Sequence, residues 1–406
     1  MYKAMSFPLL LRGFVVLGVM LMHTTWYFSH AHAESWVTIS EMLLDIISLF
    51  AVPLVMFVSG YMFISHNRHA DYYKWSFFRR MFLSVLSPYL LFSLLYLGGA
   101  WFFSNASFTL KQAAYLIVTG SSAVHMAFFR ALFGFYAIYP LLLRYFNRCR
   151  LHHRLHRFII QVILLQLFWK ICNNISCSNQ AVILTLEITT FLRYIAYFSF
   201  GMLAYIYHKK MLRWIDTHHV LLMTGFILNL ILIGGCWFAK YYLHILPLLE
   251  FVCFPLNLFL YSIIIAMLFR YACTLESQDS LSKRFMMYLG NYSFGLFLIH
   301  IIYMYVGSEL LTLLHMSPQQ LCFYPLLFII MLSLSLLTME ALARVSWGHY
   351  FIGHVAVCKK FSSYSPYIVK HHLRLQVVFL LIYSNQNLFL YASPQSRIAS
   401  KTGCRL

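Results

Sequence analysis

The sequence predicts an all-α protein that crosses a membrane many times. Of its 406 residues, 61% are hydrophobic and only 10% are charged, whereas soluble domains carry about 25% charged residues. The apolar residues come in runs long enough to cross a bilayer as helices. We therefore expect a polytopic integral membrane bundle, with residues 1–345 forming the membrane domain and residues 346–406 forming a basic cytoplasmic tail, peripheral or disordered.

Ten apolar segments are candidates for the membrane spans, and basic residues gather in every second connection between them. The connection 66–81 holds four Lys or Arg, whereas 29–40 holds none. Because basic loops stay in the cytoplasm, this alternation predicts ten spans with both termini cytoplasmic, and it explains the net charge of +19 without a nucleic-acid partner. The segments are 7–28, 41–65, 82–104, 123–143, 157–172, 191–207, 219–239, 247–271, 288–314 and 321–341.

Several classes of site are not indicated by the sequence. The nine cysteines are scattered, and no CxxC or Cys/His spacing suggests a disulfide framework or a metal site. The first apolar run is too long for a signal peptide and lacks a small-residue cleavage site, so we expect no cleavable leader. No phosphate-binding, nucleophile-elbow or zinc-protease motif occurs in a usable context.

The first apolar segment carries two polar residues that hydropathy alone does not explain, Arg12 and His23. An arginine at the centre of a spanning helix costs about 2.5–3.5 kcal/mol on insertion scales. Eleven residues make almost three helical turns, so both side chains share one face, roughly 16 Å apart. This arrangement suggests a buried site. The alternative is that Arg12 extends to the interface and His23 only hydrogen-bonds a neighbouring helix.

The predicted topology places further polar residues in the outer half of the membrane. Opposite charges occur together there, as they must in a medium of low dielectric constant. We therefore expect a polar cavity open to the outer side, although Lys170, Glu187 and Glu250 are close enough to the interface to be simply solvated. The outer set comprises His23, Asp45, His125, Arg130, Lys170, Glu187, Arg193, Glu250 and His300.

Six segments, in order, resemble the acyltransferase-3 family of integral membrane O-acyltransferases. Arg12-Gly13 followed by His23 is similar to the R-x10-H signature of that family. The departures are Ser84, where the family often has arginine, Ala127 in place of tryptophan, and Arg130 where a small or aromatic residue is usual. The other five similar segments are Val52 to Phe63, the basic run ending in Pro88-Tyr89, His125 to Phe146, the FxxGM segment near Gly201, and Leu289 to His300.

The resemblance implies transfer of an acyl group, usually acetyl, from cytoplasmic acyl-CoA to a hydroxyl of a lipid-linked or cell-surface carbohydrate. The enterobacterial sugar O-acetyltransferase branch without an extra esterase-like domain is the nearest likeness. The location implied is the bacterial inner (plasma) membrane. The partners are then acyl-CoA, a glycan acceptor and membrane lipid. No permanently bound cofactor is expected, because acetyl-CoA is the donor substrate.

Within that reaction, the arginines toward the cytoplasm suit the donor. Arg12 pairs well with phosphate because a guanidinium binds it bidentately. Arg79 and Arg80 would add to this donor site, although topology alone already explains them. His23 is our candidate for the base that removes the proton of the sugar hydroxyl, or for a transient acyl carrier.

The remaining candidates surround that base. Asp45 is the nearest acid by depth and would hold the tautomer of the His23 imidazole. Arg130 or Arg193 would stabilise the oxyanion of the tetrahedral intermediate. His125, Arg193 and His300 would line the substrate pocket.

Two other functions remain open at this point. A transporter that exports a glycan or lipid precursor without chemistry would have a similar polar cavity, but it would leave a labelled acetyl group on CoA. An inactive relative would explain the substituted motif positions, but it would not be stabilised by CoA.

Overall fold

The computed structural model describes residues 6–26, 44, 46–66, 75–104, 106–174, 185–242, 247–320, 322–345 and 348. For part of these residues, among them 75–84 and 247–254, it describes the backbone alone. The described residues are 89% helical and contain no strand, as the sequence predicts for a polytopic helical membrane protein. Residues 346–406 lie outside the described part, apart from Gly348, so the predicted tail stays a prediction.

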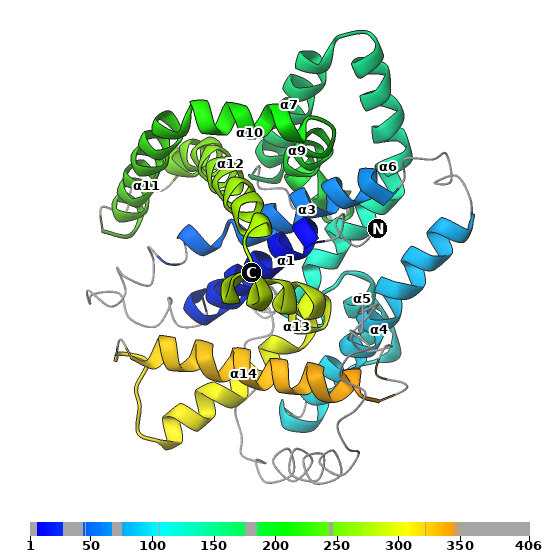
Figure 1. Cartoon of the computed structure of the whole chain (residues 1–406). Helices are drawn as coiled ribbons and strands as arrows, with labels where there is room; N and C mark the ends of the chain where they lie inside the picture. The colour runs from blue at the N-terminus through cyan, green and yellow to red at the C-terminus, as the bar shows by residue number, and fades with distance from the viewer. Residues whose placement is uncertain are drawn as a thin grey trace, which may run out of the picture.

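The helices pack around α1, which lies at the centre of the view in Figure 1. They are α1 (Ser6–Trp26), α3 (Ala51–His66), α4 (Trp75–Ser104), α5 (Leu110–Val118), η3 (Val124–Ala127), α6 (Phe128–Leu151), α7 (Leu155–Asn174), η4 (Thr189–Tyr194), α9 (Ile195–Ile206), α10 (His208–Thr217), α11 (His219–Tyr242), α12 (Pro247–Ser277), α13 (Leu281–Leu313) and α14 (Phe323–Ala343).

Nine helices in the described part are long and apolar enough to cross a membrane. The predicted sixth span, 191–207, is not among them, because there a six-residue 3₁₀ helix, η4, leads into the twelve-residue α9. At about 2.0 Å and 1.5 Å of rise per residue, the two together still extend roughly 30 Å, the thickness of the hydrocarbon core. Most of α9 is buried by protein, where a break in the regular helix is tolerated.

The relative direction of α1 and α13 supports counting η4 and α9 as one crossing. Arg12 contacts Ser293, and further along both helices the ring of His23 lies beside that of His300. The contacts advance in the same chain order, so α1 and α13 run in the same direction. Two spans that run in the same direction are separated by an odd number of other spans. The described chain has seven spans between α1 and α13 only when η4 and α9 together are counted as one. The ten-span interpretation therefore holds, while the orientation relative to the cytoplasm stays a prediction.

Glycines let two pairs of helices touch backbone to backbone. A Cβ atom on Gly13 would overlap the Met286 carbonyl, and one on Gly290 would overlap the Leu9 carbonyl, so α1 and α13 fit only because both positions are glycine. Small residues at helix contacts allow this close packing in membranes. The pair α3 and α9 repeats the pattern, since Gly60 lies against the carbonyl of Phe198 and Gly201 lies against that of Phe57.

Two apolar clusters meet at α1. One joins it to α3, α6, α7, α9 and α12, and the other joins it to α4, α6, α13 and α14. In Figure 1, α13 and α14 lie on one side of α1, and α3, α9 and α12 lie on the other. The polar residues His23, Thr24 and Thr25 of α1 are buried by protein.

Candidate functional site

Arg12 of α1 is half-buried and bound to α13. Its Nε donates a hydrogen bond to Ser293 Oγ over 2.8 Å, and Tyr136 of α6 lies close enough to interact with the guanidinium electrostatically. The side chain therefore does not extend freely into lipid. Hydrogen bonding of this kind offsets part of the cost of placing a charge among apolar helices.

His23, on the same face of α1, joins a cluster of three histidines. The centroid of its ring is 5.0 Å from that of His300 in α13 and 6.3 Å from that of His125 in η3, and the rings of His125 and His300 are 5.2 Å apart. All three side chains are buried, with exposed fractions of 5%, 0% and 4% for His23, His300 and His125. Tyr96 of α4 packs on His125, and its hydroxyl donates a hydrogen bond to the Leu298 carbonyl.

The backbone decides which nitrogen of His300 carries the proton in the neutral ring. Its Nδ1 lies 3.1 Å from the Leu296 carbonyl oxygen, and because a carbonyl only accepts, Nδ1 must donate. The lone pair is then on Nε2, which is buried and has no hydrogen-bond partner among the described residues. Neither ring nitrogen of His125 makes a well-aligned hydrogen bond within the described chain, although the Leu298 backbone lies nearby.

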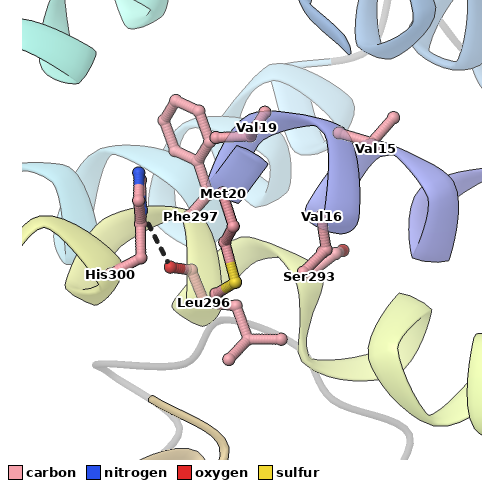
Figure 2. A pocket seen from close by; sticks show the side chains of 8 residues that line it. All are labelled: Val15, Val16, Val19, Met20, Ser293, Leu296, Phe297 and His300. Carbon is pink, nitrogen blue, oxygen red and sulfur yellow. Dashed lines mark hydrogen bonds between the residues drawn. The ribbon is translucent and has the colours of Figure 1, made fainter. Parts of the chain in front are cut away.

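We call the contact line between α1 and α13 the seam. A small cavity in this seam separates the Arg12 end from the histidines (Figure 2). Figure 2 shows Ser293 and His300 at its two ends, with Met20 and Phe297 between them. The cavity has room for about one water molecule. The expectation of a polar cavity open to the outer side stays a prediction. The wall of the small cavity is mostly apolar, because the close approach of α1 and α13 leaves the seam to be filled by Val15, Val16, Val19, Met20, Leu296 and Phe297.

Comparison with known proteins decides the family. A family model described as an acyltransferase domain, of the acyltransferase-3 type, matches residues 7–340. The chain belongs to this family. Neither the curated proteins nor the solved structures give a match. The protein is thus a multi-pass membrane acyltransferase, and the match extends over all the helices that form the histidine cluster.

The other residues expected at the site of this acyltransferase lie elsewhere or are not described. Arg130 of α6 pairs with Glu187, with Nη1 and Oε2 3.3 Å apart, and both side chains are about one-fifth exposed. Arg193 of η4 is exposed, with its guanidinium 5.6 Å from the ring centre of Tyr194. No contact in the described part joins either arginine to the three histidines, so their roles in catalysis stay predictions.

The remaining candidates, apart from Lys170, depend on parts of the chain that are not described. Asp45 lies outside the described residues. Arg79 and Arg80 belong to α4, and Glu250 belongs to α12, but their side chains are outside the described set. Lys170 is half-buried near the end of α7. Their proposed functions therefore stay predictions too.

Sequence reasoning missed two contributors to the site of this acyltransferase. Ser293 binds Arg12, and Leu296 fixes the His300 ring. Both lie within the segment Leu289 to His300, one of the six that resemble the family. A seven-residue spacing between Ser293 and His300, about two turns, was the available signal that α13 matches the polar face of α1. In the described part, no group of three His, Cys, Asp or Glu side chains is arranged to hold a metal ion.

Proposed function

We propose that this acyltransferase moves an acyl group, and specifically acetyl, from cytoplasmic acyl-CoA to a hydroxyl of a lipid-linked or cell-surface carbohydrate at the bacterial inner membrane. The observation that carries the proposal is the pairing of two sites along one seam. Arg12 and His23 lie three turns apart on α1, and both meet α13, through Ser293 and His300. The acyltransferase family supplies the reaction type.

The donor would bind at the Arg12 end. A guanidinium favours phosphate over other polar groups, because its fork of N–H donors matches two phosphate oxygens. Its Nε is already held by Ser293, which leaves the terminal N–H groups for a ligand. The distance of roughly 16 Å between Arg12 and His23 suits a ligand whose anionic end and reactive carbonyl are far apart.

His23 would act as the base. The acceptor hydroxyl oxygen forms a bond to the thioester carbonyl carbon while a ring nitrogen of His23 takes the hydroxyl proton. The carbon–sulfur bond then breaks, and the same proton passes to the departing CoA sulfur. A positioned histidine contributes about 10²–10⁴-fold to the rate of such a step. Burial among helices excludes the water that would otherwise hydrolyse the thioester.

The apolar seam has to open for this reaction. The arm of the donor cannot pass beside Met20 and Phe297 while the cavity holds only about one water. Methionine is unbranched and repacks easily, so its displacement costs little compared with movement of a branched side chain. We therefore propose that donor binding separates the side chains of this seam without separating the helix backbones.

The test is transfer of label by the purified protein. Wild-type protein in nanodiscs receives radiolabelled acetyl-CoA and a total glycolipid extract, and the label should move from CoA to the glycolipid. His23→Ala should insert normally and abolish transfer, whereas the matched control His208→Ala should keep it. Label that stays on CoA with folded wild-type protein would favour transport over chemistry. Transfer at the wild-type rate by His23→Ala would refute its role as base.

A further inference from the structure

The base proposed above needs a partner that holds its ring, and His300 is positioned for that task. A histidine base works from one tautomer, so its second nitrogen is usually hydrogen-bonded to a fixed acceptor. In most enzymes the acceptor is a carboxylate. No carboxylate in the described part contacts His23, whereas the His300 ring is its nearest imidazole, with centroids 5.0 Å apart.

His300 has the properties of a fixed acceptor. Its Nδ1–H is held by the Leu296 carbonyl, so the ring presents the bare Nε2 and cannot rotate without losing this hydrogen bond. Nε2 is completely buried and has no partner in the described chain. A buried acceptor left unpaired costs about 1–3 kcal/mol, which favours any arrangement that gives it a donor.

The spacing of the rings allows that donor to be His23. An N–H···N hydrogen bond is about 3 Å long and each nitrogen lies about 1 Å from its ring centre, so two bonded imidazoles have centroids roughly 5 Å apart. The observed 5.0 Å meets this distance, with the ring planes inclined at 47°. Rotation of the His23 ring to aim an N–H at Nε2 would complete the bond, and catalytic hydrogen bonds often tighten only when substrate is bound.

His125 is the other candidate donor, and its surroundings make it less suitable. Its ring lies 5.2 Å from His300, but it stands nearly edge-on at 68°. It also has the Leu298 backbone nearby as a second acceptor. His23 makes no hydrogen bond to another acceptor in the described part, so the single lone pair of His300 is better used by His23.

We propose that His300 is the positioning residue for His23: its Nε2 accepts the N–H of the His23 imidazole, so that the opposite nitrogen of His23 is free to act as base. This inference rests on the proposed function. It replaces the carboxylate expected from the sequence, Asp45, by a neutral imidazole held by the Leu296 carbonyl. When His23 takes the hydroxyl proton, its positive charge is then stabilised by a dipole rather than by a full negative charge.

Two substitutions of His300 separate positioning from packing. In His300→Gln the side-chain amide reaches the place of Nε2 and keeps an acceptor for His23. In His300→Asn the amide reaches only the place of Nδ1, so it keeps the contact with Leu296 and loses the acceptor. His300→Asn should lower the kcat of acetyl transfer about 100-fold and leave the KM for acetyl-CoA unchanged. His300→Gln should keep kcat within about 10-fold of the wild-type value.

The controls distinguish this inference from the proposed function itself. His208→Asn, at a half-buried histidine elsewhere, should leave kcat unchanged, and melting temperatures in detergent exclude unfolding as the cause. If wild-type protein transfers acetyl and His300→Asn keeps wild-type kcat, the inference is refuted while the function stands. Asp45→Asn lowering kcat when His300→Asn does not would assign the positioning role to Asp45. Absence of transfer by the wild type would refute both.

Discussion

Replacing Gly290 by alanine tests whether the contact of α1 with α13 holds the site together. A Cβ atom at this position would lie 2.8 Å from the Leu9 carbonyl carbon and 3.1 Å from the Leu9 Cα, and it would overlap the carbonyl oxygen. Ordinary contacts begin at 3.4 Å. All three atoms belong to the backbone, so they cannot rotate aside, and α1 must move away from α13 by at least roughly 0.6 Å.

The expected cost is the balance of two opposing terms. Alanine in a helix is favoured over glycine by about 0.5–1 kcal/mol, whereas overpacking of a fitted contact costs about 1–3 kcal/mol, occasionally more. Gly290→Ala should therefore lower the free energy of unfolding by about 1–2 kcal/mol. The displacement also separates His23 from His300, and a misplacement of about 1 Å at a site can cost 100-fold in rate.

The assay compares this variant with Gly234→Ala. Gly234 lies in α11, and no atom is within 4 Å of a Cβ added there, so the control gains helix propensity without a clash. In detergent, Gly290→Ala should melt several degrees below wild type, and Gly234→Ala should melt at or above it. Acetyl transfer should fall only in Gly290→Ala. A melting temperature for Gly290→Ala equal to that of the control would show that α1 and α13 do not meet as described.

Three further predictions concern charged residues. Arg12→Lys should raise KM for acetyl-CoA about 10-fold in steady-state assays because lysine cannot bind phosphate bidentately, and an unchanged KM would count against a donor site there. Burial lowers the pKa of His208 below 6.5, so the folded state binds fewer protons than the unfolded state. The contribution of His208 to stability is therefore full above about pH 6.5 and is lost as the pH falls. His208→Gln should flatten the decline in melting temperature between about pH 7 and pH 5. Arg130→Met and Glu187→Gln should show a coupling of about 0.5–1 kcal/mol in a double-mutant cycle of thermal stability, and strictly additive effects would contradict the ion pair.

Much of the architecture could be predicted because hydropathy and loop charge act locally. The length of apolar runs predicts the spans, and the spacing of Arg12 and His23 predicts a shared face, which the structure confirms as the face toward α13. The break in the sixth span was not predictable in this way. A segment buried by its neighbours is selected for packing, so its apolar composition does not reveal where a 3₁₀ helix replaces an α-helix.

The site itself was less predictable, because its contacts join residues far apart in the chain. Depth in the membrane grouped nine polar residues, but it could not separate the histidines that meet from Arg130, which pairs with Glu187 instead. Depth also says nothing about how closely two helices pack, and glycines bring α1 and α13 together. The glycines were visible in the sequence as Gly13 and Gly290, but their pairing appears only in three dimensions.

The partner of Arg12 lies 281 residues further along the chain, and this has a consequence for synthesis. The nascent chain must insert α1 long before α13 leaves the ribosome. During that time the Arg12 guanidinium has no Ser293 beside it, and keeping α1 in the bilayer costs more free energy. Chains that end before α13 should therefore be retained by the insertion machinery or degraded, so that only full-length molecules persist in the membrane.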